Sequence, residues 1–145
     1  MDLIRPWLYI GKYRDTLDGA YLQSKSITAM LQLAEEVKKP GIISLYLPVE
    51  DTEPIPRDFL QRGVFFVREQ KRQRGCILVA CGAGINRSSS FCTAVLKEEE
   101  NLSLFEAFKE VKRLHSESAP HLPVWESLCE YYGEVVSYRQ IMSLP

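Results

Sequence analysis

The chain has 145 residues, of which 46% are hydrophobic and 26% are charged, and its formal net charge is -1. These values are typical of one compact domain over residues 1–145, and they give no electrostatic case for a nucleic-acid or membrane partner. No apolar run approaches the roughly 18 residues of a membrane span. The N-terminus also lacks the charged start and apolar core of a signal peptide, so we expect a cytoplasmic protein.

Short apolar runs in the first third of the chain predict strands over residues 7–10, 27–33 and 42–47. Gly11 is expected to close the first of them. A polar loop over residues 49–56 follows the third strand. Pro56 suits the first turn of a helix in which Leu60, Val64 and Val67 recur at helical spacing.

The run over residues 76–80 is almost wholly apolar, which predicts a strand in the centre of a sheet. A short loop follows it, and a helix is expected to start near Arg87. The buried face of that helix should carry Phe91, Cys92, Val95 and Leu96.

Two further helices are predicted near the C-terminus. Ser103 and Glu106 have the spacing of a capping box, and an apolar stripe follows at Leu104, Ala107, Phe108 and Val111. Pro123 opens the last helix, with one face made by Val124, Leu128, Tyr131 and Val135. Strands interleaved with helices predict an α/β domain, in which helices pack on a small central sheet, mixed or parallel.

The loop from Cys81 to Arg87 has the features of an anion site. A strand, a glycine-containing loop and a helix start present unpaired N–H groups, and the helix dipole favours negative charge. Glycine lets the backbone approach a ligand closely, so the loop amides can form a nest around one phosphate. The predicted phosphate-binding residues are Gly82, Ala83, Gly84, Ile85, Asn86 and Arg87.

Three side chains of this segment suit phosphoryl transfer. Cys81 lies at the foot of the nest, whose N–H groups would stabilise a nucleophilic thiolate. Arg87 can hold two phosphate oxygens with its planar guanidinium. The Ser88 hydroxyl can donate a hydrogen bond to the sulfur. The loop has no Gly-Lys-Ser/Thr and no third spaced glycine, so a nucleotide P-loop and a dinucleotide fingerprint are both disfavoured.

The pattern Cys81-x-x-Gly84-x-x-Arg87-Ser88 resembles the signature of the protein tyrosine phosphatase superfamily, and the chain is most similar to its small, atypical dual-specificity branch. The resemblance extends along nearly the whole chain, through residues 6–11, 26–31, 47–52, 102–107 and 120–125. It implies the cysteine-phosphatase fold, a phosphocysteine intermediate and no metal or other cofactor. The implied substrates are proteins carrying phosphotyrosine, phosphoserine or phosphothreonine.

The resemblance also implies a general acid, because ester cleavage needs a proton for the leaving oxygen. Asp51, on the loop after the third predicted strand, matches the acid of the family. Glu50 and Glu53 are its neighbours, and Asp58 is a weaker candidate because it should lie inside the following helix.

The chain departs from the family pattern directly before the cysteine, where Ala80 replaces the usual histidine. We therefore expect the Cys81 thiol to ionise less readily, and the enzyme to be slower, than in relatives that have the histidine. An asparagine directly before the motif arginine, as at Asn86 here, is also found in RNA 5′-triphosphatase relatives of the family. The loop between Cys81 and Arg87 contains no lysine or arginine, which argues against a highly charged inositol substrate.

Three alternatives remain open at this point. They are a phosphate-binding scaffold module with weak turnover, a phosphatase acting on RNA 5′ ends, and a Cys–His hydrolase that pairs Cys81 with His115 or His121. The two histidines do not complete a zinc-like cluster with the cysteines, so no metal site is predicted.

The remaining cysteines and the charged clusters are expected to have structural rather than catalytic roles. The four cysteines are expected to be reduced, and Cys76 should face the side of its strand opposite to Cys81. Oxidation could join Cys81 to Cys76 or Cys92. The basic residues Arg68, Lys71, Arg72 and Arg74 are expected to form a solvated helix face away from the pocket, and residues 98–100 a solvated helix end.

Overall fold

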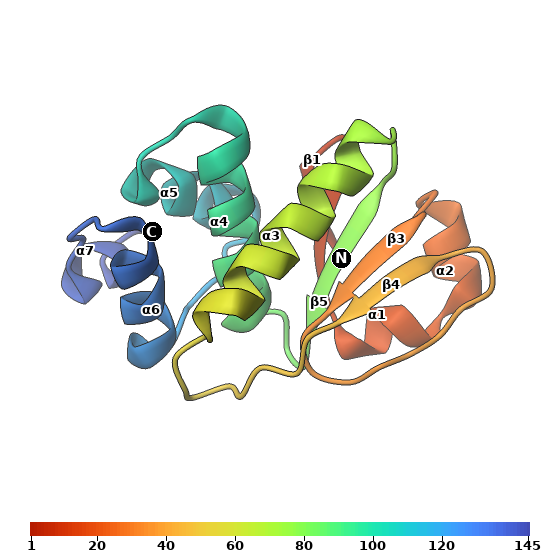
Figure 1. Cartoon of the computed structure of the whole chain (residues 1–145), viewed down its shortest axis with the longest axis horizontal. Helices are drawn as coiled ribbons and strands as arrows, with labels where there is room; N and C mark the ends of the chain where they lie inside the picture. The colour runs from red at the N-terminus through yellow and green to blue at the C-terminus, as the bar shows by residue number, and fades with distance from the viewer.

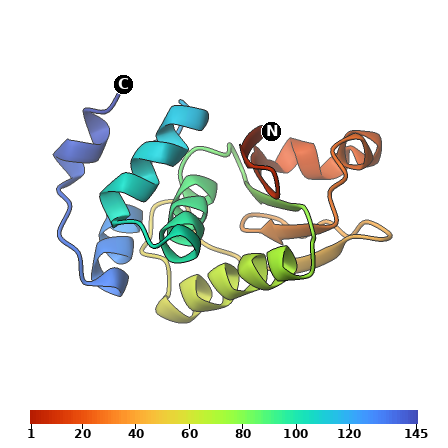
Figure 2. The ribbon, with the colours of Figure 1, turned by 90° about the horizontal axis from the view of Figure 1, so that it is seen from above.

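The computed structural model describes residues 1–145 as a single α/β domain with a five-stranded sheet and helices on both of its faces (Figures 1 and 2). The strands are β1 (Asp2–Arg5), β2 (Leu8–Lys12), β3 (Ala29–Gln32), β4 (Ile43–Tyr46) and β5 (Ile77–Cys81). The helices are α1 (Tyr13–Leu17), α2 (Gly19–Ser24), α3 (Arg57–Arg72), α4 (Arg87–Glu100), α5 (Leu104–Leu114), α6 (Leu122–Tyr132) and α7 (Tyr138–Met142).

The sheet has the order β1-β2-β5-β3-β4, which makes it a mixed sheet, as predicted. Strand β1 is antiparallel to β2, whereas β2, β5, β3 and β4 run parallel. Strand β5 is central and every residue in it is buried, which confirms the prediction from its continuous apolar run. The carboxyl ends of the four parallel strands therefore meet at one edge of the sheet, where the candidate site lies.

The two faces of the sheet are covered unequally. Helices α1 and α2 lie on one face, and α3 lies on the other with α4 beside it (Figure 2). Helix α5 packs against α4 and β1. The larger core cluster has 28 buried residues and includes Ile77, Val79 and Cys81 of β5. The smaller cluster holds Leu78 and Ala80, with Cys76 packed against it. Cys76 and Cys81 thus face opposite sides of the sheet, which confirms the expected alternation.

Several short elements were not predicted. These are β1, α1, α2 and α7, each of four to six residues. Elements of this length contain too few turns or alternations to produce a hydrophobic period. Gly11 lies inside β2 rather than closing it. Glycine suits this position because of close packing, since a Cβ atom there would come within 2.6 Å of Asp15 and 2.9 Å of Leu78.

The predicted face of the last helix is wrong at one position. Helix α6 ends at Tyr132, and Gly133 caps it in the left-handed conformation with φ of 63°. Val135 consequently lies beyond the helix and is fully exposed. A left-handed glycine after a helix is a common termination signal, and it outweighs the apolar spacing that continues past it.

The charged clusters are also less solvated than predicted. Glu99 of α4 accepts hydrogen bonds from Arg68 at 2.8 Å and Lys71 at 2.6 Å, both from α3. Glu100 pairs with Arg5 of β1, at 2.7 Å. The acidic run 98–100 and part of the basic cluster therefore join neighbouring elements at the edge of the fold. None of the helices has the length and apolar character needed to span a bilayer.

Candidate functional site

The candidate site lies where β5 runs into α4. Cys81 is the last residue of β5 and is 2% exposed, and α4 begins at Arg87, as predicted. The loop after β4, which carries Asp51, passes the same end of the sheet before it enters α3 (Figure 1). Parallel strands thus bring the cysteine loop and the acid loop together, although they are far apart in the sequence.

Hydrogen bonds from outside the phosphate loop, residues 82–86, determine how its peptide groups are oriented. The N–H of Tyr13 donates to the Gly82 carbonyl at 3.3 Å, and the N–H of Ala119 donates to the Ile85 carbonyl at 3.0 Å. His115 Nε2 lies 2.7 Å from the Gly84 carbonyl, which can only accept. A trans peptide is planar, with its N–H directed opposite to its C=O. The amides that follow these carbonyls therefore face the other side, as an anion nest requires.

Gly84 is the loop position that most clearly requires glycine. Its φ is 74°, and a Cβ atom there would lie 2.8 Å from the Gly11 carbonyl oxygen. Both the left-handed conformation and the close approach to β2 exclude a side chain. The guanidinium of Arg87 approaches the loop as well, since a Cβ atom on Gly82 would lie 3.1 Å from Arg87 Nη2.

The Cys81 sulfur is contacted by the backbone at the start of α4. The N–H of Ser88 donates to Sγ at 3.4 Å. The Ser88 hydroxyl, which was expected to donate to the sulfur, donates instead to the Gly11 carbonyl at 3.4 Å. The helix start therefore provides the donor to the sulfur, and the hydroxyl ties α4 to β2.

The acid loop is attached to the phosphate loop through Arg87. Arg87 Nη1 donates to the Val49 carbonyl at 2.8 Å, and Nε lies 3.4 Å from Asp51 Oδ1. The Asp51 side chain is 53% exposed, so it is open to a ligand above the loop. Asp58 lies in the first turn of α3, as predicted, and is exposed beside Arg62 at 4.0 Å. Glu50 and Glu53 are exposed on the acid loop.

The Asn86 side chain is 4% exposed and turns away from the nest. Its Nδ2 donates to the Asp51 carbonyl and, at 2.8 Å, to Asp51 Oδ1. Its Oδ1 accepts a hydrogen bond from the N–H of His121 at 2.8 Å. Only the Asn86 backbone is thus available to a phosphate, and the side chain links the acid loop to the start of α6.

His115 has a structural neighbour that the sequence did not indicate. Its Nδ1 lies 2.6 Å from a carboxylate oxygen of Asp2, in β1, while Nε2 contacts Gly84. Both ring nitrogens are therefore engaged, and neither contacts Cys81 as a Cys–His hydrolase would require. Asp2 escaped notice because 113 positions separate it from His115, and no local pattern links residues that far apart.

Asp2, His115 and Glu117 are also the residues best grouped to hold a cation. One ligand atom from each lies within 4.8 Å of the others. A cation at His115 Nδ1 would have to replace its 2.6 Å hydrogen bond to Asp2. The hydrogen bonds make Asp2 and His115 a support for the loop at Gly84.

The environment of the other thiols differs from that of Cys81. Cys92 of α4 is fully buried, and burial, followed by the nearby Cys81, raises the pKa of its thiol. Burial also raises the thiol pKa of Cys76 and of Cys129. All four cysteines are free thiols. Ala80 is 2% exposed and belongs to the smaller apolar cluster with Leu22 and Met30.

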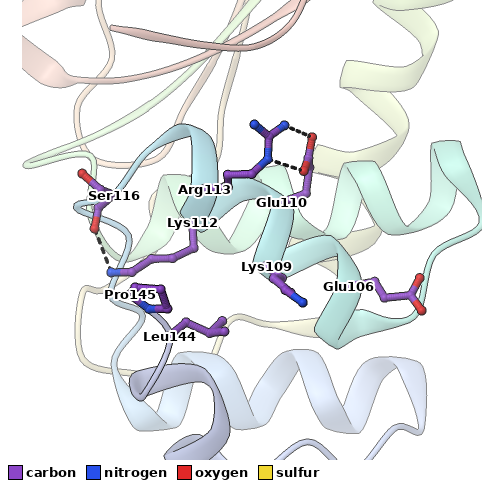
Figure 3. A pocket seen from close by; sticks show the side chains of 8 residues that line it. All are labelled: Glu106, Lys109, Glu110, Lys112, Arg113, Ser116, Leu144 and Pro145. Atoms are coloured by element: carbon purple, nitrogen blue, oxygen red, sulfur yellow. Dashed lines mark hydrogen bonds and ion pairs between the residues drawn. The ribbon is translucent and has the colours of Figure 1, made fainter.

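A cavity lies away from this site, beside α5. It has a volume of about 500 Å³ and is bounded by α5 and the C-terminal residues Leu144 and Pro145 (Figure 3). Its charged groups are largely paired: Arg113 with Glu110 at 2.8 Å, and Lys112 with the Ser116 carbonyl at 2.7 Å. No residue of the phosphate loop lines it.

The arrangement of β5, a Cys-x5-Arg loop and α4 on a largely parallel sheet defines the cysteine-phosphatase fold. The sequence profile of the dual specificity phosphatase catalytic domain matches residues 8–134. The chain therefore belongs to the dual specificity phosphatase catalytic domain family.

Individual relatives agree with this membership. Human dual specificity protein phosphatase 16 is 32% identical over 139 residues, covering 91% of this chain and 21% of that protein. Rat dual specificity protein phosphatase 5 is 30% identical over 138 residues, covering 92% of this chain and 36% of that protein. The chain thus spans between a fifth and just over a third of these relatives.

Solved structures show the same fold. Human DUSP28 has a TM-score of 0.85 and 26% identity, covering 92% of this chain and 96% of that one. A mouse putative dual specificity phosphatase complexed with zinc tungstate has a TM-score of 0.83 and 28% identity, covering 90% of this chain and 84% of that one.

Proposed function

We propose that this chain is a cysteine-dependent phosphatase that hydrolyses phosphotyrosine and phosphoserine or phosphothreonine in proteins, and that residues 1–145 form its catalytic domain. The observation that carries the proposal is the convergence of three groups at one sheet edge. The Cys81 sulfur accepts a hydrogen bond from the Ser88 N–H, the Arg87 guanidinium lies close to Gly82, and Asp51 Oδ1 lies 3.4 Å from Arg87 Nε.

In the first step, the Cys81 thiolate attacks phosphorus. A sulfur–phosphorus bond forms, the ester phosphorus–oxygen bond breaks, and Asp51 gives its proton to the leaving oxygen. The loop amides and Arg87 hold the equatorial oxygens, so most of the catalysis is positioning and electrostatic stabilisation.

In the second step, water attacks the phosphocysteine. Asp51, now a carboxylate, takes a proton from the water, the sulfur–phosphorus bond breaks, and inorganic phosphate leaves. The Ser88 N–H, 3.4 Å from Sγ, stabilises the departing thiolate. The second step therefore regenerates both the thiolate and the protonated acid.

Two observations support the proposed substrate class: the charge of residues 81–88 and the names of the related proteins. Arg87 is the only cation in the segment 81–88, which suits one phosphomonoester better than a polyphosphorylated ligand. The relatives are named dual specificity protein phosphatases. A reactive thiolate also needs a reducing compartment, and on this ground we propose the cytoplasm.

The proposal is tested by hydrolysis of phenyl phosphate and of phosphopeptides in the presence of EDTA. We expect turnover by the wild type, none by Cys81→Ser, and a loss of roughly 10²- to 10⁴-fold for Asp51→Asn. Arg87→Ala should lose phosphate binding as well as turnover. A wild type without metal-independent turnover would refute the proposal, and so would an active Cys81→Ser variant.

The same assay separates the alternatives. Tungstate binding without turnover would indicate a phosphate-binding scaffold. Faster release of phosphate from 5′-triphosphate RNA than from phosphopeptides would indicate an RNA 5′-end phosphatase.

A further inference from the structure

We propose that Asn86 is a positioning residue for the general acid, and that it determines which oxygen of Asp51 delivers the proton. This inference rests on the proposed function. Asn86 was expected to serve the phosphate, but its buried side chain contacts Asp51 and His121 instead. The residue therefore acts on the acid loop from inside the phosphate loop.

The orientation of the Asn86 amide follows from its partners. The backbone N–H of His121 is a donor, so the atom 2.8 Å from it must be Oδ1. The Asp51 carbonyl and Asp51 Oδ1 both accept, so the NH₂ group must face them. The opposite orientation would set a donor against a donor and an acceptor against two acceptors. The network thus permits one orientation of this amide.

The two oxygens of Asp51 are consequently unequal. Oδ1 accepts from Asn86 at 2.8 Å and faces Arg87 Nε at 3.4 Å. A proton on Oδ1 would oppose the Asn86 N–H that donates to this oxygen, whereas Oδ2 has no hydrogen-bond donor against it. The acid proton therefore resides on Oδ2, and Asn86 holds the carboxyl group so that this oxygen is free for the leaving group.

Asn86 also connects the acid to a rigid part of the fold. His121 is the N-cap of α6, and the Asn86 carbonyl accepts from the Ser90 N–H at 3.1 Å and the Ser90 hydroxyl at 2.8 Å. The exposed acid loop is thus attached to two helix starts by one residue, to α6 through the Asn86 side chain and to α4 through the Asn86 backbone. A displacement of about 1 Å in a reacting group can lower a rate by roughly 10²-fold, so such an attachment has a catalytic consequence.

Two variants separate the contact with Asp51 from the contact with His121. Asn86→Ala removes both. Asn86→Asp retains an oxygen for the His121 N–H but sets a carboxylate against Asp51. We expect both variants to lose roughly 10- to 100-fold in kcat/KM for phenyl phosphate. The loss should be smaller for nitrophenyl phosphate, whose leaving group needs less protonation.

A structural readout accompanies the kinetics. Amide hydrogen exchange at His121 should be faster in Asn86→Ala and close to wild type in Asn86→Asp. Circular dichroism and thermal unfolding of each variant show that the fold is retained. In the Asp51→Asn background, Asn86→Ala should produce no further kinetic loss, because the acid is already absent.

Three results would overturn the inference. The dependence of kcat/KM on leaving-group basicity could be unchanged in both Asn86 variants. Asn86→Ala could cause an equal loss in the Asp51→Asn background, which would place its effect on the phosphate loop. A wild type without turnover would refute the proposed function itself and this role with it. That result is distinguishable from the other two, because in it the unmodified protein is inactive.

Discussion

His115 Nε2 lies 2.7 Å from the carbonyl oxygen of Gly84, while the other ring nitrogen lies 2.6 Å from the carboxylate of Asp2. The ring is therefore held from both sides, by β1 and by the loop after β5. The strand β1 thereby holds a histidine against the back of the phosphate loop. Ala80 stands where the family has a histidine that helps to hold the loop. In this chain the contact from His115 supports the loop instead, from the side of β1.

Replacing His115 should therefore weaken the phosphate loop. In His115→Ala the buried Gly84 carbonyl loses its partner, at a cost of about 1–3 kcal/mol, and the Ile85 amide is no longer oriented. We expect kcat/KM for phenyl phosphate to fall about tenfold. Glu117→Gln is the matched control, since Glu117 lies beside His115 without a hydrogen bond to the loop. Equal activity in the two variants would contradict the prediction that His115 supports the loop.

Gly84→Ala should reduce both activity and stability. The left-handed conformation costs a non-glycine residue about 1–2 kcal/mol, and the new methyl group would lie 2.8 Å from the Gly11 carbonyl oxygen. Gly133→Ala is a control with a similar φ, 63°, but with open space around the new methyl group. Gly133→Ala should lower the free energy of unfolding by the same conformational cost of about 1–2 kcal/mol and leave kcat/KM unchanged. Urea unfolding and phenyl phosphate hydrolysis measure the two effects.

The ion pairs around α4 and α5 predict how stability depends on pH. Hydrogen bonds from Lys71 and then Arg68 lower the pKa of Glu99. A hydrogen bond from Arg113, assisted by Arg5, lowers the pKa of Glu110 from 4.5 to about 2. Because both pKa values are lower in the folded state, the stabilisation is present above pH 4.5 and is lost as the pH falls below it, in the case of Glu110 toward pH 2.

Glu99→Gln tests this dependence. It should lower the free energy of unfolding at pH 7 by about 1 kcal/mol and reduce the loss of stability as the pH falls below 4.5. Glu35→Gln replaces an exposed glutamate that lies outside the helices and has no ion pair, so its pH profile should match the wild type. Urea unfolding across this pH range makes the comparison, and identical profiles for the two variants would rule out the Glu99 contribution.

The thiols should differ in reactivity. Cys92 is fully buried and burial raises its pKa, so iodoacetamide should leave it unmodified in the folded protein at neutral pH. Cys81 lies under the phosphate loop, so its alkylation should abolish turnover and be slowed by tungstate. Mass spectrometry after labelling identifies the modified residues, and denatured protein, in which all four cysteines react, is the reference. Preferential labelling of Cys92 in the folded state would conflict with its burial.

Local patterns were sufficient for the central part of the fold. The apolar run before Cys81 identified the central strand, and the stripes behind Pro56 and Ser103 identified α3 and α5. The patterns were insufficient for β1, α1, α2 and α7, which are too short to show a period. They were misleading at Val135, because the left-handed Gly133 ends α6 before the apolar spacing does.

The sequence by itself determined the junction of strand, loop and helix start over Cys81 to Ser88, because these residues are contiguous and such a junction is a local structure. Its resemblance to a family also singled out Asp51. Only the tertiary structure decided what holds these groups: Asp2 and His115 behind Gly84, Tyr13 and Ala119 on the neighbouring carbonyls, and Asn86 between Asp51 and His121. These partners meet because a largely parallel sheet gathers strand ends from distant parts of the chain. Hydrogen bonds between such residues have no periodicity or fixed spacing by which a sequence could reveal them.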